Sequence, residues 1–320
     1  MKKRRVLVTG ASGFVGEAVI FRLLLDGKFT PIAAMRASTR LNGLCPVVPF
    51  DLCRPESMPV LSSVDVVIHC AARVHVMNET AIDSLSAFRQ ANVEGTVWLA
   101  RQAASCGVKR FVFISSIKVN GESTGRGALF RADDEPAPLD PYGISKCEAE
   151  VALRRIGAKT GMEVVVIRPP LVYGPGVKAN FLVMMRWLDR GLPLPFGMLD
   201  NRRSLVSLGN LADLIVTCIE HPAAANQTFL VSDGEDLSTS QLLLHMARAM
   251  DKLAILLPVP TVLLKLLGSA FGKSSAIDRL CGSLQVDIGP TQKMLGWQPP
   301  LSAEKAFRET ADYYLEKYKK

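Results

Sequence analysis

Short apolar runs alternate with helical patterns of apolar positions over the first half of the chain. We expect six strands, at residues 6–8, 30–36, 47–51, 64–69, 111–116 and 163–168. We expect helices from Gly16 to near Gly27, over residues 82–106 and over residues 142–156. Because nearly continuous apolar strands are typical of sheets buried on both faces, this alternation predicts an α/β fold with a Rossmann-type doubly wound parallel sheet.

The first expected strand runs directly into a turn with three glycines, which in turn opens a helical pattern. Glycines allow a tight turn, a close approach of backbone to a pyrophosphate, and close packing of the helix on the strand. The N–H groups at the start of the helix favour negative charge. This context predicts a dinucleotide site, with contacts from Gly10, Ser12, Gly13, Phe14, Val15 and Gly16.

After about residue 170 the pattern loosens, because prolines and glycines interrupt the chain repeatedly. We expect a dinucleotide-binding domain over residues 1–170, with its core returning around residues 203–220. Residues 171–320 are then mostly a smaller substrate-binding part. Ligands of open α/β sheets bind at the carboxyl ends of the strands, so we place this part over that edge.

Composition narrows the class of protein. The chain has 320 residues, 48% of them hydrophobic, which is ample for a large core. The net charge of +8 is scattered apart from basic clusters at the two ends, which we interpret as solvated tails, so no nucleic-acid partner is expected. Seven cysteines without a CxxC pair indicate reduced thiols in a cytoplasmic protein.

Two further classes of site are not expected. The most apolar segment, residues 253–271, is interrupted by Pro258, Pro260 and Lys265, so we predict no stable membrane insertion. We predict no metal site, because the histidines are far apart and lack ligand spacing. They are His69, His75, His221 and His245. His69 ends an apolar strand and is interpreted as a core residue.

Tyr142 and Lys146 form the sharpest chemical pattern. Asp140 and Pro141 are favourable at the N-cap and first position of a helix, so Tyr142 begins a helix and Lys146 lies one turn later on the same face. A free tyrosine has a pKa of about 10. A nearby ammonium favours the phenolate and lowers the pKa of tyrosine. The pair follows a strand that ends in Ser115 and Ser116, an order that favours catalysis.

These residues together resemble the extended short-chain dehydrogenase/reductases of the nucleotide-sugar epimerase, dehydratase and reductase group. The resemblance covers nearly the whole chain. The segments that carry it are the glycine turn, Asp51-Leu52, His69-Cys70-Ala71-Ala72, Asn92 to Thr96, Ser115-Ser116, Tyr142 with Lys146, and Arg168 to Gly176. The resemblance implies a homodimer formed through the helices at 82–106 and after Tyr142.

The resemblance also implies roles for individual residues. Ser116 would polarise the sugar carbonyl, Tyr142 would be the acid/base, and Lys146 would hold the nicotinamide ribose. Asp51 and Leu52 would contact adenine. The cofactor would further touch Ala71, Ala72, Asn92, Tyr142 and Pro169.

At the substrate end, the resemblance implies contacts with a UDP-sugar. Asn180 resembles the start of a helix that binds a nucleoside diphosphate, and Phe196 fits either stacking on uracil or the core. Arg203 would grip the pyrophosphate. A planar guanidinium suits phosphate oxygens in any case, although a solvated surface arginine is the alternative. Arg279 is a second candidate phosphate contact by position.

Departures from the family pattern bear on the reaction. An acid about 20 residues after the first glycine selects NAD, but this place holds Met35 and Arg36. Arg36, helped by Arg40, could neutralise a 2′-phosphate, so NADP(H) is favoured and NAD(H) stays possible. The acidic pair of the dehydratases is replaced by Ile117 and Lys118. Asn120 replaces a usual tyrosine.

The prediction that follows is a reductase. The runs 115–121 and 193–197 most resemble bacterial O-antigen 4-ketoreductases such as UDP-N-acetylquinovosamine dehydrogenase. Such an enzyme reduces the C4 ketone of a UDP-4-keto-6-deoxy-N-acetylhexosamine with NAD(P)H. Two alternatives stay open: a UDP-N-acetylhexosamine or UDP-glucose 4-epimerase with tightly bound NAD, and a non-catalytic NADP(H)-binding protein.

Overall fold

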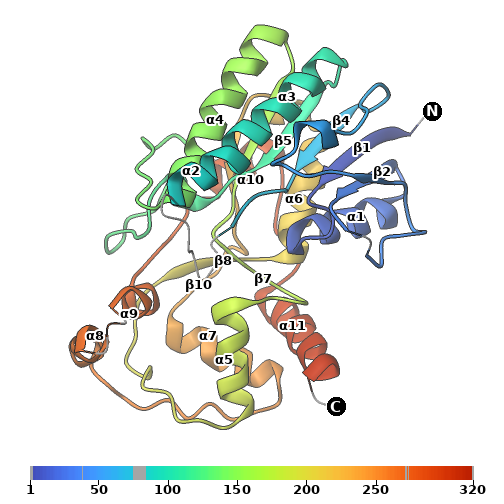
Figure 1. The fold of residues 1–320 in the computed structure, drawn as a ribbon. Helices are drawn as coiled ribbons and strands as arrows, with labels where there is room; N and C mark the ends of the chain where they lie inside the picture. Colours follow the sequence, from blue (N-terminus) through green and yellow to red (C-terminus); the bar gives the residue numbers. More distant parts are fainter. Residues whose placement is uncertain (1–2, 38, 75–83, 271, 273, 319–320) are drawn as a thin grey trace.

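The computed structural model describes residues 3–37, 39–74, 84–270, 272 and 274–318. At its centre lies a seven-stranded sheet in the order β3-β2-β1-β4-β5-β6-β9 (Figure 1), in which every neighbouring pair is parallel. The strands are β1 (Arg4–Thr9), β2 (Phe29–Met35), β3 (Val47–Pro49), β4 (Val66–His69), β5 (Arg110–Ile114), β6 (Glu163–Arg168) and β9 (Thr228–Leu230). The predicted Rossmann-type sheet is confirmed.

Helices cover both faces of this sheet, which explains why its strands are apolar throughout (Figure 1). On one face α1 (Phe14–Asp26) packs against α6 (Leu208–Glu220), and their apolar side chains join those of β1 in a buried cluster. The other face carries α2 (Ser84–Arg89), α3 (Gly95–Ser105) and α4 (Pro141–Thr160), which bury Leu99 and Leu153 with Phe111. The strand order changes direction between β1 and β4, the place where such sheets bind ligands.

Residues 171–320 build a second cluster of elements. A three-stranded sheet in the order β10-β8-β7 is formed by β7 (Leu171–Tyr173), β8 (Arg203–Ser207) and β10 (Asp236–Leu237). The helices are α5 (Ala179–Asp189), α7 (Thr239–Ala249), α8 (Thr261–Ala270), α9 (Ser274–Cys281), α10 (Gly289–Leu295) and α11 (Ala303–Tyr318). Figure 1 shows all of these helices except α10 grouped beyond β7 and β8, away from α3 and α4. The chain returns to the large sheet through α6 and β9.

Some element boundaries differ from those expected from the sequence. β4 begins at Val66, not at residue 64, because the N–H of Val64 closes a turn with the carbonyl of Leu61 at 3.0 Å. β5 ends at Ile114, since Ser116 caps a 3₁₀ turn, η3 (Ile117–Val119). The strand β9 was not expected.

The helix expected over residues 82–106 is not continuous in the structure. Residues 82 and 83 lie outside the described residues. Between α2 and α3 stands a π-helical turn, η2 (Gln90–Glu94), which carries Asn92. Such turns inside helices are frequent at functional sites.

Candidate active site

The glycine turn brings the end of β1, the start of α1 and the loop after β4 into close contact. Gly10 has φ +66°, and a Cβ there would lie 2.7 Å from the backbone nitrogen of Ala71. A Cβ at Gly16 would lie 2.3 Å from the carbonyl oxygen of Gly10. Gly13 donates its N–H to that carbonyl at 2.8 Å and precedes α1. These contacts leave no room for a side chain at any of the three glycines. The backbone at the start of α1 is therefore not covered by side chains of the turn.

A cleft of about 410 Å³ opens beside this turn at the carboxyl ends of β1, β2 and β4. Its lining includes nine of the predicted cofactor contacts or their neighbours: Gly10, Ser12, Gly13, Met35, Arg36, Asp51, Leu52, Ala71 and Ala72. Phe14 and Val15 are half-buried on α1, whereas Gly16 and Pro169 are buried. Gly16 therefore shapes the turn from behind.

The two arginines expected to bind a 2′-phosphate are placed differently. Arg36 is exposed at the end of β2 and lines the cleft. Arg40 instead donates two hydrogen bonds to the carboxylate of Glu17, both at 2.7 Å, and lies over the ring of Phe21. The guanidinium of Arg40 is thus paired with an acid on α1, and its expected help to Arg36 stays a prediction.

The three predicted catalytic residues lie just after β5 and in the first two turns of α4, which approach each other where Lys146 binds the carbonyl of Ile114. Ser116 follows this strand, and its Oγ accepts the N–H of Lys118 at 3.3 Å. Lys146 reaches back from α4 and donates its ammonium to the carbonyl of Ile114 at 2.8 Å. Tyr142 is the second residue of the same helix, and its ring makes an edge contact with the ring of Phe88 at a centroid distance of 6.1 Å. A Cβ at Gly143 would lie 2.9 Å from the carbonyl of Lys118, so α4 approaches η3 closely.

Electrostatics at this site differ from the expected pattern. Burial lowers the pKa of Lys146 from 10.5 to about 8, while its ammonium lies 4.4 Å from the centre of the Phe113 ring. Burial and the charge of Asp140 raise the pKa of Tyr142. The sequence predicted a lowered tyrosine pKa. The difference arises because desolvation of the phenol makes the largest contribution to its pKa, and the charge of Asp140 acts in the same direction.

His69 is a satisfied core residue, as predicted. Its side chain is fully buried, and its two ring nitrogens contact the hydroxyls of Thr9 at 2.6 Å and Thr96 at 2.9 Å. Burial and the charge of Lys146 lower the pKa of His69 to about 3, so the ring is neutral. It stacks beside Phe113 under the site.

Asn92 fixes two parts of the site to each other. Its side chain exchanges two hydrogen bonds with the backbone of Arg73, at 2.7 and 3.0 Å, and donates a third to the hydroxyl of Ser145 at 3.0 Å. These contacts join the loop after β4 to α4. Asn92, predicted to touch the cofactor, is only 1% exposed and holds the walls of the cleft in place.

Sequence reasoning missed a buried network behind the site. Glu150 on α4 accepts two hydrogen bonds from Arg168, at 3.0 and 2.6 Å, and one from Ser115 at 2.5 Å. Arg168 also donates to Asn120 at 3.0 Å. This contact gives Asn120 a structural role in place of the usual tyrosine. The sequence signal that could have revealed this network was an acid, Glu150, and an arginine, Arg168, within elements that are otherwise largely buried.

A second ion pair flanks the start of α4. Asp140 accepts the N–H of Gly143 at 2.7 Å, and its other carboxylate oxygen is bound by the ammonium of Lys118. Lys118 also reaches Glu122 at 3.2 Å. Lys118 stands where the resemblance expects an acid in dehydratases. In this structure it is the ion-pair partner of Asp140, the N-cap of α4.

The predicted substrate contacts are only partly assembled. Arg203, half-buried at the start of β8, donates to the carbonyls of Arg279 at 2.7 Å and Gly282 at 3.0 Å. Asn180 is exposed in the first turn of α5. Phe196 is 6% exposed and belongs to the apolar cluster of the C-terminal part, as in the core alternative.

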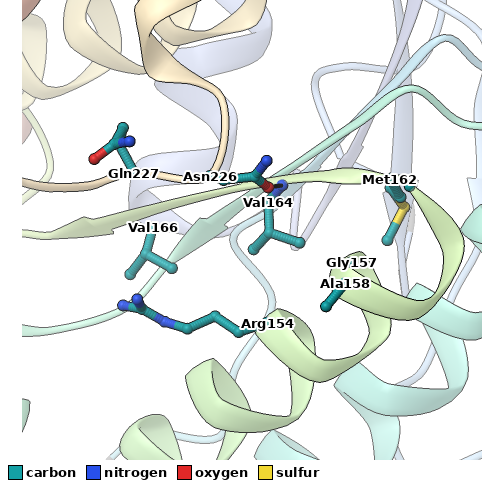
Figure 2. Close-up of a pocket in the computed structure, with 9 residues that line it drawn as sticks. Arg154, Gly157, Ala158, Met162, Val164, Val166, Asn226 and Gln227 are labelled. Carbon is teal, nitrogen blue, oxygen red and sulfur yellow. Dashed lines mark hydrogen bonds between the residues drawn. The ribbon is translucent and has the colours of Figure 1, made fainter.

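Another hollow, of about 290 Å³, lies at the opposite edge of the sheet. Figure 2 shows it between the end of α4 and the start of β6, with Asn226 and Gln227 across from Arg154. Arg154 is the one ionisable side chain in the described lining, and it donates to Thr228 at 2.7 Å. This hollow holds none of the predicted site residues.

Two kinds of feature are absent from the part of the chain that the structure describes. They contain no group of three or more histidine, cysteine or acidic side chains that could hold a metal ion. Among the helices of the described ranges, none has the length and apolar character needed to cross a membrane.

Comparisons with known proteins agree with this architecture. The NAD dependent epimerase/dehydratase family matches residues 6–232. A protein of Vibrio cholerae named UDP-glucose 4-epimerase is 49% identical over 316 residues, which are 98% of this chain and 96% of that protein. A solved UDP-glucose 4-epimerase of Thermotoga maritima with UDP-glucose has a TM-score of 0.78 at 22% identity, over 98% of this chain and 99% of that one. A UDP-glucuronic acid 4-epimerase of Bacillus cereus with NAD has a TM-score of 0.79 at 20% identity, over 98% of both chains. The glycine turn, the cleft beside it and this match over most of the chain place the protein in the NAD dependent epimerase/dehydratase family.

Proposed function

We propose that the protein is a 4-epimerase of a UDP-hexose or UDP-N-acetylhexosamine that keeps NAD tightly bound. The observation that carries this proposal is the 49% identity, over 98% of the chain, to a protein named UDP-glucose 4-epimerase. Because of this identity, the reductase predicted from the sequence becomes the second candidate. The chemistry at the end of β5 fits the epimerase reading, since it offers one acid/base and one polarising hydroxyl.

The cleft beside the glycine turn fits a dinucleotide. Gly10 and Gly13 leave backbone exposed where a Cβ would block the turn, and α1 begins against it. Positive helix ends of this kind bind phosphates. Asp51 lies in the same cleft and presents a carboxylate, which suits an adenosine hydroxyl or amine. Bound there, NAD would supply a reversible hydride acceptor.

The residues of the chain then handle the protons and the orientation. In the proposed reaction the hydroxyl on C4 of the sugar gives its proton to the phenolate of Tyr142, and the same phenol returns a proton when the ketone is reduced. The hydroxyl of Ser116 donates to the developing oxyanion. Lys146 is mostly protonated at neutral pH, with a pKa of about 8. In the proposed reaction a positive charge near the phenol would favour the phenolate.

Positions 117 and 118 argue against dehydration. Loss of water from the sugar needs a second acid/base pair besides the tyrosine. Ile117 is buried, and Lys118 is held by Asp140 and Glu122. Oxidation and reduction at C4 need no such pair.

A 4-ketoreductase is the second candidate, and Arg36 favours it. Its guanidinium lines the cleft where an acid would select NAD. A cation there suits the extra phosphate of NADPH, a cofactor that brings in a hydride and leaves oxidised. The ketone of a UDP-4-keto-6-deoxy-N-acetylhexosamine would be the substrate.

One experiment separates the two candidates. The purified protein is denatured, and the released nucleotide is identified by mass; NAD is expected. The native protein is then incubated with UDP-glucose and UDP-N-acetylglucosamine without added cofactor, and the C4 epimers are followed by NMR. Consumption of NADPH with the 4-keto substrate, together with no epimer formed, would establish the reductase instead.

Tyr142→Phe is the matched control for this experiment. Loss of the phenol should lower turnover by about 10²-fold or more, while the released amount of nucleotide stays as in the wild type. Unchanged turnover would contradict the acid/base role of Tyr142.

A further inference from the structure

Large apolar side chains are exposed to solvent along one stretch of the C-terminal part. Leu253 is 88% exposed, Val262 is 71% exposed and Leu266 is 63% exposed. Together with their exposed neighbours they form the apolar surface, whose members are Leu253, Ile255, Leu257, Val262, Leu263 and Leu266. Single exposed apolar residues need no explanation, whereas a contiguous patch of them marks an interaction site.

One half of the apolar surface comes from an extended segment, residues 253–257. Its backbone pairs with Leu194, whose N–H bonds the carbonyl of residue 255 and whose carbonyl accepts the N–H of residue 257, both at 2.8 Å. Successive side chains of an extended chain point to opposite faces. Ala254 and Leu256 pack on the apolar cluster of the C-terminal part, so the side chains at 253, 255 and 257 point outwards. Both faces of this segment are therefore apolar.

The other half is the outer face of α8. Leu264 is buried in the same cluster, and a Cβ at Gly268 would lie 2.6 Å from the side chain of Ile277 on α9. These two positions, one turn apart, define the inner face of α8, and Val262 and Leu266 lie on the opposite face. Figure 1 shows α8 at the end of the molecule away from β1 and β2. Because both halves pack inwards on one cluster, their outer faces are neighbours.

Positive charge borders the apolar surface. Residues 252–282 contain four basic side chains and one acidic one, Asp278. Lys252 directly precedes the extended segment and lies 3.3 Å from Asp189. Lys265 lies on α8 with 56% of its side chain exposed, 3.8 Å from Asp278, in an exposed pair of the kind that contributes little. Such a lysine can lay its aliphatic stem along apolar surface and keep its ammonium in water.

This charge favours a lipid surface over a second copy of the chain as the partner. In a two-fold dimer a patch meets the same patch, so the basic border of one copy would face that of the other. An anionic phospholipid surface attracts lysines and takes up apolar side chains where headgroups meet acyl chains. An apolar centre with a basic border therefore fits such a membrane.

We propose that the apolar surface docks the protein on membranes that contain anionic phospholipid. The extended segment and α8 enter the boundary between headgroups and acyl chains, while Lys252 and Lys265 contact lipid phosphates. Pro258 and Pro260 divide the apolar run, so the contact is a shallow one on the bilayer surface and not a span. Docking goes beyond the proposed epimerisation and applies equally to the reductase.

Flotation of the whole purified protein with lipid vesicles tests this proposal. Vesicles of equal parts phosphatidylcholine and phosphatidylglycerol should bind the protein about 10-fold more tightly at low salt than vesicles of phosphatidylcholine alone. Salt at about 1 M should remove most of this difference, because it screens exposed charges.

Variants at exposed positions locate the contact. Leu253→Ser with Val262→Ser should weaken binding to the mixed vesicles by about 10-fold or more, since two apolar side chains no longer leave water. The matched control, Leu25→Ser with Val60→Ser, removes the same residue types from positions 84% and 83% exposed and should bind as the wild type does. Circular dichroism checks that both variants keep the fold.

Lys265→Gln tests the contribution of charge. Binding to the mixed vesicles should weaken by about 3- to 5-fold, and binding to phosphatidylcholine alone should not change. The matched control is Lys293→Gln, at an exposed position on α10, which should bind both kinds of vesicle as the wild type does.

Three results would overturn the proposal. One is no binding to either kind of vesicle, and another is an equal loss in the Leu253/Val262 variant and its control. The third is self-association of the wild type in sedimentation velocity that this variant loses, without vesicle binding, which would show that a second copy covers the apolar surface. Vesicle binding does not depend on the sugar, so a failed epimerase assay leaves this test intact.

Discussion

At the scale of residues, Lys146 is the side chain whose burial has the clearest consequence for stability. It is 2% exposed, and its pKa is lowered from 10.5 to about 8. A lysine with a lowered pKa binds fewer protons in the folded protein than in the unfolded chain. The free energy of unfolding therefore rises as pH increases from about 8 to about 10, and the buried charge costs stability at pH 7.

Lys146→Met should show this cost directly. We expect the nucleotide-free variant to gain about 1 to 2 kcal/mol in the free energy of unfolding at pH 7, after the lost bond to Ile114 is counted. The difference in the free energy of unfolding between the variant and the wild type should become smaller as pH rises towards about 10. Urea unfolding at both pH values measures the difference. A gap that does not change with pH would contradict the prediction.

At the scale of elements, the buried pair of Glu150 and Arg168 joins α4 to the ends of β5 and β6. Both side chains are 3% exposed or less, and Ser115 completes the contact. A buried ion left without its partner typically costs about 3 to 5 kcal/mol. This pair therefore holds the helix with Tyr142 and Lys146 against the strand that leads to Ser116.

Glu150→Ala should lower the free energy of unfolding by about 3 kcal/mol or more. The matched control is Glu148→Ala on the same helix, whose exposed pair with Arg89 should contribute about 0.5 kcal/mol or less. Glu150→Met with Arg168→Met should recover much of the loss, since no charge is left buried. Equal effects of the two alanine variants in urea unfolding would refute this account.

The same elements show what the sequence could and could not indicate. Apolar runs located the six predicted strands within two residues of each boundary, because burial on both faces is a local signal. Asp140 and Pro141 located the start of α4 for a similar reason. The π turn at Asn92 depends on partners 19 and 53 residues away, and β9 is a strand of three residues defined by its pairing with β6. Neither has a local pattern.

The positions of the predicted catalytic residues can be compared with the structure, while their roles stay a prediction. Ser116 follows β5, Lys146 binds the carbonyl of Ile114 in that strand, and Tyr142 lies in the first turn of α4. The direction of the pKa of Tyr142 was wrong, because it depends on burial and on where the lysine ammonium points. The pairing of Arg40 with Glu17, which stands 23 residues earlier, was likewise not indicated by the sequence. Contacts of this kind follow from the packed fold alone.

At the scale of the whole molecule, one buried cluster links the large sheet to the C-terminal part. Asp233, just after β9, accepts hydrogen bonds from Tyr173 of β7 at 2.8 Å and from Asn210 of α6 at 2.7 Å. Asn210 also exchanges two bonds with the backbone of Leu301, at 2.9 and 2.8 Å, just before α11. We expect the two parts to unfold together because this cluster lies between them.

Asn210→Ala tests this coupling. Asn210 is fully buried, and its loss leaves the N–H and carbonyl of Leu301 and one oxygen of Asp233 without this partner. Each such group costs about 1 to 3 kcal/mol, so the variant should lower Tm clearly, while the exposed Asn42→Ala should not. We propose that this cluster also helps to hold the C-terminal part, the candidate site of the UDP-sugar, in its place relative to the large sheet. KM for the UDP-sugar should therefore rise more than the content of bound nucleotide falls. An unchanged Tm, or equal losses of nucleotide and sugar binding, would show that the cluster does not couple the two parts.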